Sequence, residues 1–263
     1  METAEFVKFV DHEGRALAAA AEAAGVDASV PTCPGWQVRN LLRHTGAVHR
    51  WAASFVAEEH TSPRPIGDPP DLDGAELLAW YRDSHRLLVD TLAAAPADTA
   101  AWTFHPAPAP SPLFFWARRQ AHETAVHRYD VESALGGTPG PVTARFAADG
   151  IDELLRGFHA RSRSRVRTEA PRVLRVRVFD AAPEADLDLD PGATRAADPE
   201  AVWTVRLSPE PPVTTRDEAG DADCELAGTA EQLYLALWNR RPVPNVTGDA
   251  SLAALWREKS AIG

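Results

Sequence analysis

Four long segments with helical periodicity occupy the first half of the sequence, and stretches rich in proline or glycine separate them. In the second segment, apolar residues recur every three or four positions between Trp36 and about Glu59, which is typical of an amphipathic helix. The breaks "VPTCPGW", "TSPRPIGDPPD" and "HPAPAPSP" contain the residues that end helices. The predicted helices span residues 3–24, 36–59, 73–95 and 112–135. Four helices in this order predict a four-helix bundle.

The pattern changes near residue 140, where the stretch "ALGGTPGPV" follows the fourth helix. After one further predicted helix, at about 143–160, three short segments show the alternation of strands: "RVLRVRVFD", "AVWTVRLS" and "DADCELAG". Two more helices are predicted in "TAEQLYLALWNR", with Thr229 as its cap, and in "SLAALWREKS". We therefore expect an α+β protein with a four-helix bundle in residues 1–140 and a smaller α/β domain in residues 141–263.

The overall charge excludes some classes of partner. The chain has 263 residues, of which 44% are hydrophobic, so it can bury a substantial core, and its formal net charge is −11. A molecule this acidic is repelled by nucleic acid and by anionic membrane surfaces, so we expect no nucleic acid and no membrane as a partner. Arg175 and Arg177 belong to an arginine-rich stretch but alternate with Leu174, Val176 and Val178, as on a strand with one solvent-exposed face.

The N-terminal segment and the cysteines bear on the cellular compartment. The first 25 residues have acidic side chains and no long apolar run, so neither a signal peptide nor a transmembrane helix is expected, and we expect a cytoplasmic protein. Cys33 and Cys224 are the only cysteines and have no CxxC spacing, so both are expected to be reduced. Cys33 precedes the second helix closely enough for its thiolate to be stabilised there; a buried, small hydrophobic side chain is the alternative.

One row of polar side chains in the fourth predicted helix is a candidate for a metal site. Glu123, His127 and Asp130 are four and three residues apart, so they share one stripe of the helix. The alternative is a solvated, charged helix face, since such pairs are common on exposed helices. His122 is excluded as a second ligand beside His127, because side chains five residues apart point about 140° away from each other. We expect His122 to face a neighbouring helix or solvent.

His44 in the second predicted helix is a candidate partner for this row. It lies three residues after Leu41 in the apolar stripe, so its side chain should point into the bundle. His49, five residues further on, is expected to be exposed. If the second and fourth helices are neighbours, His44 meets Glu123 and His127, and two imidazoles with one carboxylate leave a coordination position open for catalysis. A core histidine bonded to another protein group is the alternative.

The stretches "VPTCPGWQVRNLLRHTGAVHRW" and "HETAVHRYDVE" resemble the mycothiol-dependent maleylpyruvate isomerase family of actinobacteria, and the resemblance covers nearly the whole chain. It implies a DinB-like four-helix bundle followed by a smaller, sterol-carrier-like α/β domain. It further implies that His44, Glu123 and His127 bind zinc, or another divalent metal, and that Asp130 is an acidic residue of the same site that contacts the cofactor or takes part in catalysis.

The same resemblance implies a cofactor and a reaction. The cofactor is mycothiol, a low-molecular-weight thiol, and the substrate is a small electrophilic molecule. An arginine near the C terminus takes part in catalysis, for which Arg241 or Arg240 is available in "LALWNRRPVPNVTGD". The expected activity is cis–trans isomerisation or thiol S-transfer by a monomer or small homo-oligomer. A thiol-independent metal hydrolase and a non-catalytic protein that binds a small ligand are the alternatives.

Overall fold

The computed structural model describes residues 1–105, 109–179 and 200–262. These residues form two compact units. The first contains residues 1–104 and 109–140, and the second contains residues 141–179 and 200–262 together with His105. The first is helical and the second combines helices with a sheet, so the predicted α+β class is confirmed.

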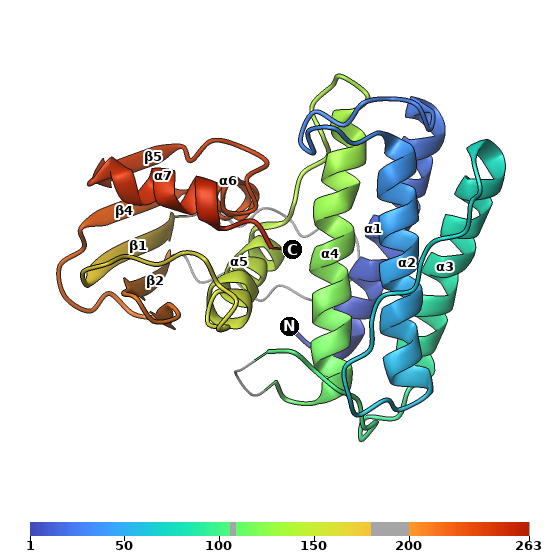
Figure 1. Cartoon of the computed structure of the whole chain (residues 1–263), viewed down its shortest axis with the longest axis horizontal. Coiled ribbons are helices and arrows are strands. Elements are labelled where there is room, and N and C mark those ends of the chain that lie inside the picture. The colour runs from blue at the N-terminus through green and yellow to red at the C-terminus, as the bar shows by residue number, and fades with distance from the viewer. Residues whose placement is uncertain (106–108, 180–199, 263) are drawn as a thin grey trace. The chain divides into compact units, whose positions relative to one another are not determined.

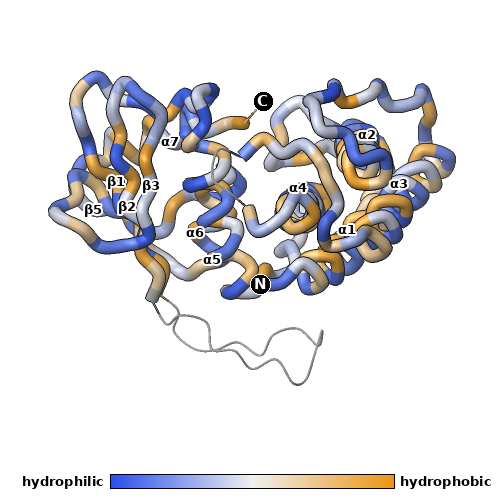
Figure 2. Tube along the Cα trace, turned by 90° about the horizontal axis from the view of Figure 1, so that it is seen from below, coloured by the Kyte–Doolittle hydropathy of each residue, from blue (hydrophilic) through white to orange (hydrophobic). Residues whose placement is uncertain are grey.

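The first unit is a bundle of four long helices, as the periodicity predicts (Figure 1). The helices are α1 (Thr3–Ala24), α2 (Val38–Ala57), α3 (Gly74–Ala94) and α4 (Pro112–Ser133). Helix α1 packs against α3 and α4, and α2 packs against α3 and α4. Hydrophobic residues gather on the mutually facing sides of these helices (Figure 2). No helix among the described residues is long and apolar enough to cross a membrane.

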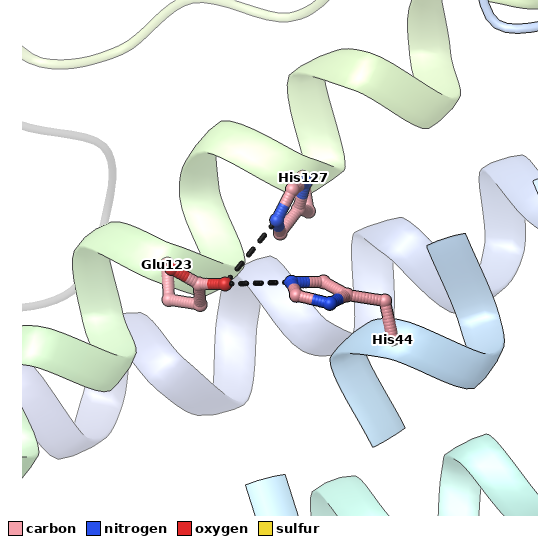
Figure 3. A group of neighbouring side chains, drawn as sticks. All are labelled: His44, Glu123 and His127. Atoms are coloured by element: carbon pink, nitrogen blue, oxygen red, sulfur yellow. Dashed lines mark hydrogen bonds and ion pairs between the residues drawn. The ribbon is translucent and has the colours of Figure 1, made fainter. Parts of the chain in front are cut away.

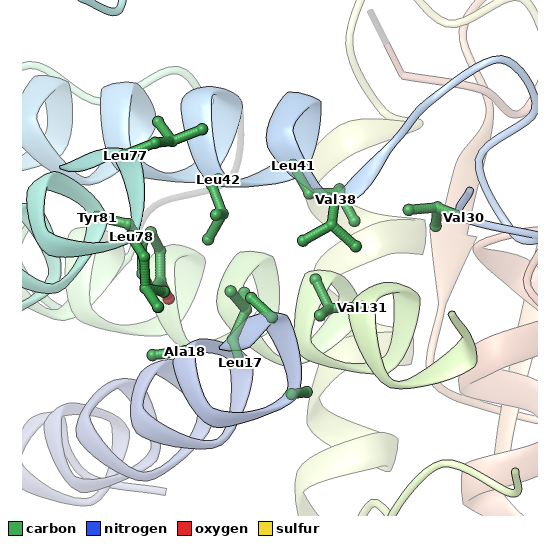
Figure 4. Packing of buried hydrophobic residues seen from close by; sticks show 12 residues of the cluster. Leu17, Ala18, Val30, Val38, Leu41, Leu42, Leu77, Leu78, Tyr81 and Val131 are labelled. Atoms are coloured by element: carbon green, nitrogen blue, oxygen red, sulfur yellow. The ribbon is translucent and has the colours of Figure 1, made fainter. Parts of the chain in front are cut away.

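A cluster of buried aliphatic side chains and one tyrosine holds one end of the bundle together (Figure 4). Leu17 of α1, Leu41 of α2 and Tyr81 of α3 are fully buried in it, and Val131 of α4 joins them. Each of the four helices therefore contributes to one core. Burying a large apolar side chain stabilises a fold by about 1.5–3 kcal/mol, so this cluster fixes the relative positions of α2 and α4.

The start of α4 is set by local chemistry. Ser111 precedes the helix, and its hydroxyl accepts a hydrogen bond of 3.1 Å from the amide of Phe114. Pro112 occupies the first helical turn, where its missing amide proton costs nothing because that group has no partner inside the helix. The polar row of α4 consequently begins three turns into a helix whose start is fixed.

The second unit contains a five-stranded mixed sheet, with the strand order β3-β2-β1-β4-β5. The strands are β1 (Arg172–Phe179), β2 (Glu200–Leu207), β3 (Val213–Thr215), β4 (Cys224–Gly228) and β5 (Asn245–Gly248). Strand β1 pairs antiparallel with β2 and parallel with β4, so that Val176 lies between Trp203 and Leu226. All three of these side chains are fully buried. The helices of this unit are α5 (Ala144–Asp152), α6 (Ala230–Leu237) and α7 (Ala250–Lys259).

The cap predicted at Thr229 is confirmed. Its hydroxyl accepts from the amide of Gln232 at 3.3 Å, and the Gln232 side chain accepts from the amide of Thr229 at 3.1 Å. The two residues form a reciprocal capping box, which satisfies two amide groups at the start of α6.

Other parts of the second unit differ from the sequence-based expectation. The helix predicted at 143–160 is α5 followed by a π-helical segment, η1 (Glu153–Phe158). Strands β3 and β5 were not predicted, since β3 is only three residues long and every residue of β5 is exposed, which leaves no alternation to detect. The solvent-exposed face predicted for β1 is wrong at Arg175, which is buried and donates to the carbonyl of Gly220.

Candidate metal centre

The "PTCPGW" stretch forms a tight turn that leads into α2. The amide of Trp36 donates to the carbonyl of Cys33 at 2.9 Å, with Pro34 and Gly35 at the two central positions. Gly35 has φ +83°, a conformation that side-chain-bearing residues rarely adopt, and proline followed by such a glycine is typical of a type II turn. The turn therefore fixes the chain immediately before the helix that carries His44.

Three predicted ligands converge between α2 and α4 (Figure 3). Nε2 of His44 lies 3.1 Å from Oε1 of Glu123, and Nε2 of His127 lies 3.2 Å from the same oxygen. One ligand atom from each residue lies within 4.8 Å of the other two. Because His44 comes from α2 and the other two from adjacent turns of α4, the packing of these two helices determines the cluster.

Arg119 pairs with the other oxygen of Glu123. Its Nη2 lies 3.3 Å from Oε2 of the carboxylate, and Arg119 is almost completely buried. Burial raises the pKa of Glu123, but hydrogen bonds from His127 and His44 and the charge of Arg119 outweigh it, so the pKa lies well below its usual range. Glu123 is thus an anion that presents Oε1 to the two histidines.

Asp130 holds the second nitrogen of His127. Its Oδ2 lies 3.0 Å from Nδ1 of His127, and its Oδ1 accepts a hydrogen bond of 2.6 Å from Thr32 in the turn before α2. Burial lowers the pKa of His127, but the hydrogen bonds to Asp130 and Glu123 prevail and raise it to about 9. In the metal-free protein the imidazole is therefore protonated on both nitrogens at neutral pH, with Nδ1 facing Asp130 and Nε2 facing Glu123.

The arrangement suits a divalent metal such as zinc. Two imidazoles and one carboxylate are a known donor set of catalytic zinc sites, and donors at tetrahedral zinc distances are about 3.4 Å apart. The measured separations of 3.1 and 3.2 Å are close to that value. In metal sites, a carboxylate that hydrogen-bonds the nitrogen of histidine not used for the metal orients the ring and fixes its tautomer. Asp130 has this position relative to His127.

Trp36 and Cys33, both in the turn before α2, contact different groups of the bundle. Trp36 lies edge to face with His44, with 5.5 Å between the ring centroids, and His44 is in turn 5.0 Å from the ring of His127. Cys33 is partly buried and packs against the hydrophobic cluster of the bundle. Cys33 and Cys224 do not form a disulfide.

The structure decides between the two interpretations of the row on α4 and contradicts one expectation for α2. The row on α4 is not a solvated face, because His127 and Asp130 are buried and the side chain of Glu123 is only 19% exposed. The prediction that His49 is exposed is wrong: it is fully buried, its Nε2 lies 3.0 Å from the hydroxyl of Thr124, and burial lowers its pKa to about 3. The reason is that α2 packs against both α3 and α4, so its buried arc is wider than one apolar stripe.

His122 and the two arginines occupy other positions. His122 is fully buried and faces α1, where its ring lies edge to face with Phe6 at 6.1 Å. Arg240 and Arg241 follow α6 in the second unit, and Nη1 of Arg240 donates to the carbonyl of Trp238 at 2.7 Å. The structure thus brings together His44, Glu123, His127 and Asp130, whereas a catalytic role for Arg240 or Arg241 stays a prediction.

Sequence reasoning missed Thr32 and the role of Arg119. Thr32 is 98 residues from its partner Asp130, and no spacing rule connects a turn to a helix at that distance. Arg119 is four residues before Glu123, so the helical spacing could have revealed this pair.

Comparison with known proteins agrees with this architecture. The mycothiol maleylpyruvate isomerase N-terminal domain matches residues 9–132, and the C-terminal domain of the same family matches residues 145–255. No curated protein matches the sequence significantly.

Two crystal structures share the fold. One is of a histidine-to-alanine mutant of the mycothiol-dependent maleylpyruvate isomerase, with 11% identity and a TM-score of 0.57, and the other is of the mycothiol-dependent maleylpyruvate isomerase, with 12% identity and a TM-score of 0.54. Each comparison covers 94% of this chain and 92% of the other. The chain belongs to the mycothiol-dependent maleylpyruvate isomerase family.

Proposed function

We propose that the chain is a mycothiol-using enzyme that acts on a small electrophile and holds a zinc ion, or another divalent metal, at His44, Glu123 and His127. The observation that carries the proposal is the convergence of these three donors on one point between α2 and α4. The membership of the family supports mycothiol as the thiol. When bound, zinc and mycothiol together supply a thiolate nucleophile at neutral pH.

The residues of the chain prepare the site for these groups. Asp130 would keep a proton of His127 on Nδ1, so that Nε2 is the nitrogen that gives up its proton when a cation binds. Arg119 engages Oε2 of Glu123, so that Oε1 remains available as a single donor. With three protein donors, a zinc ion held there would have a position left for a thiol.

The substrate requires a separate anchor if it carries a carboxylate, since the chain as a whole is acidic. We propose Arg241, or its neighbour Arg240, for this role, because guanidinium groups bind carboxylates through paired, charge-assisted hydrogen bonds. Replacing Arg241 by alanine is then expected to raise the KM for a carboxylate substrate and leave the zinc content unchanged.

Incubation of the zinc-loaded protein with mycothiol and a panel of electrophiles, including maleylpyruvate, tests the proposal. Both the thiol concentration and the cis-to-trans conversion are followed. An isomerase turns over its substrate and conserves the thiol, whereas an S-transferase consumes the thiol with the electrophile. Activity that persists without any thiol, or no activity with any electrophile, would contradict the proposal.

A further inference from the structure

A hollow lies in the first unit between α2, α3 and the connection that joins these two helices. Its volume is about 370 Å³, within the range of about 300–1,000 Å³ that is common for small-molecule sites. Ala47, Arg50 and Trp51 of α2 line one side, Trp80 of α3 lines another, and Arg64 and Asp68 contribute from the connection between the two helices. None of these residues belongs to the metal centre.

The connection between α2 and α3 runs along α2 (Figure 1), and its residues Arg64, Pro65, Gly67 and Asp68 line the hollow. The indole of Trp51 donates to the carbonyl of Arg64 at 2.9 Å. Nearer the start of α2, the guanidinium of Arg43 donates to the carbonyl of Leu72 at 2.8 Å. The connection is therefore attached to α2 at two points, so that the wall it contributes is already in place before a ligand binds.

The hollow lies next to the metal centre along the same helix. Trp51 follows His44 by seven residues, which is about two helical turns, or roughly 10 Å of rise, with a rotation of only about 20°. Ala47 is less than one turn beyond His44. A molecule whose sulfur is held at His44, Glu123 and His127 therefore reaches this hollow if the rest of it extends roughly 5–10 Å along α2.

The lining favours a ligand with many hydroxyl groups. Arg64 and Asp68 carry opposite charges, and the third charged residue, Arg50, is engaged by Trp80 and Ser84. Among the described residues, neither the side chain of Arg64 nor that of Asp68 has a hydrogen-bond or ion-pair partner. A guanidinium only donates hydrogen bonds and a carboxylate only accepts them, whereas a hydroxyl does both; a ring with several hydroxyls can bind to both.

Two indoles supply the apolar part of the site. The guanidinium of Arg50 lies over the ring of Trp80, 5.5 Å from the ring centroid. Nε of Arg50 also donates to the hydroxyl of Ser84 at 2.7 Å, which orients the guanidinium. Trp51 is fixed by its bond to Arg64 and by an edge-to-face contact with Trp116 at 5.1 Å. Large, rigid aromatic surfaces of this kind bind the apolar faces of a ring at small entropic cost.

We infer that this hollow binds the polyhydroxylated ring portion of the thiol cofactor, with Arg64 and Asp68 as hydrogen-bonding residues and Trp51 and Trp80 as packing surfaces. The inference rests on the proposed function, because it takes the ring to belong to the same molecule whose sulfur binds at the metal centre. A thiol built on a sugar and a cyclitol, as mycothiol is, has the required chemistry.

Calorimetric titration of the zinc-loaded protein with mycothiol and with N-acetylcysteine tests the inference. Arg64→Ala and Asp68→Ala are each expected to weaken mycothiol binding about tenfold, the loss of roughly one charged hydrogen bond, and to leave N-acetylcysteine binding unchanged. Asp71→Ala, on the same connection but outside the hollow, is the matched control. All three side chains are exposed, so the variants should fold, and circular dichroism checks this.

Three results separate the failure of this inference from that of the proposed function. Equal affinity of the wild type for the two thiols, or unchanged mycothiol affinity in both variants, overturns the inference while zinc binding still supports the metal centre. Displacement of mycothiol by free myo-inositol in the wild type, and not in Asp68→Ala, supports it. A wild type that binds no zinc, yet binds myo-inositol through Asp68, overturns the proposed metal centre and with it the assignment of the ring to a metal-bound thiol, while the hollow remains a site for a polyhydroxylated ring.

Discussion

Asp130 and His127 are joined by a 3.0 Å contact between Oδ2 and Nδ1, three residues apart on one face of α4. Asp130 is fully buried, and a buried carboxylate without a partner is costly. Its two oxygens are used by His127 and Thr32. The carboxylate thus links the turn before α2 to a candidate metal ligand on α4, and the orientation of His127 depends on that link.

Replacing Asp130 by asparagine tests this dependence. The amide keeps the size of the side chain but removes the charge that holds the proton of His127 on Nδ1. We expect zinc affinity, measured by competition with a chelating dye, to fall about 10- to 100-fold. Asp83→Asn, an exposed acid on α3, should bind zinc like the wild type. Equal affinity in Asp130→Asn and the wild type would show that the contact does not orient the ligand.

Thr32 should contribute to stability through the same carboxylate. In Thr32→Val the hydroxyl that donates to Oδ1 of Asp130 at 2.6 Å is lost at nearly constant volume. The expected decrease in the free energy of unfolding is about 1–3 kcal/mol, because a buried acceptor is left with one partner fewer. Thr32→Ser keeps the hydroxyl and should recover most of the loss. Urea unfolding of the metal-free proteins measures both, and identical midpoints for valine and serine would refute the assignment.

The pair between Arg128 of α4 and Glu13 of α1 is buried, with 2.7 Å between Nε and Oε2. Removing the arginine alone, in Arg128→Met, leaves the carboxylate buried without its cation and should reduce the free energy of unfolding by about 3–5 kcal/mol. The double variant with Glu13→Met removes both charges and is expected to be more stable than Arg128→Met. A double variant that loses the sum of the two single effects would contradict this coupling.

His159 in the second unit makes stability depend on pH. Burial lowers its pKa to about 4, below the ordinary value of 6.5. The unfolded chain therefore binds a proton that the folded chain does not, so this contribution destabilises the fold as pH falls from 6.5 toward 4 and vanishes above that window. Between pH 7 and pH 5 the expected loss is about 2 kcal/mol, from about 1.4 kcal/mol for each pH unit below 6.5.

The His159→Gln variant cannot titrate and provides the comparison. Its own stability at pH 7 is expected to be lower, because the contacts of the imidazole with Ser164 and Trp256 are altered. The diagnostic quantity is the difference between pH 7 and pH 5 for each protein, obtained from denaturant unfolding. That difference should be smaller in the variant by about 2 kcal/mol, and an equal difference in both would show that His159 does not titrate in this range.

Helical spacing alone was sufficient to find the polar row of α4, because side chains three and four residues apart share a face. His44 could be placed by the apolar stripe of α2, which points toward α4. The burial of His49 could not be predicted in this way. The buried arc of α2 depends on how many helices surround it, and α3 covers the side that carries His49. Contacts such as Thr32 with Asp130 depend on the way a turn folds over a distant helix, which no local pattern encodes.

In the second unit the same distinction applies. Strand β1 was predictable because Leu174, Val176 and Val178 alternate on one buried face. Strand β5 was not, because its residues are all exposed and β4 is the one described strand with which it pairs. Its position is set by hydrogen bonds between main chains, which leave little trace in the choice of side chains.

The most direct test of the central claim is the zinc content of the purified, zinc-equilibrated protein and of His44→Ala, Glu123→Ala and His127→Ala. The wild type should hold about one tightly bound zinc per chain, and each variant should lose it while circular dichroism shows an unchanged helical content. His12→Ala, an exposed histidine of α1, should retain the metal. Equal zinc in the wild type and His127→Ala would contradict the proposed centre.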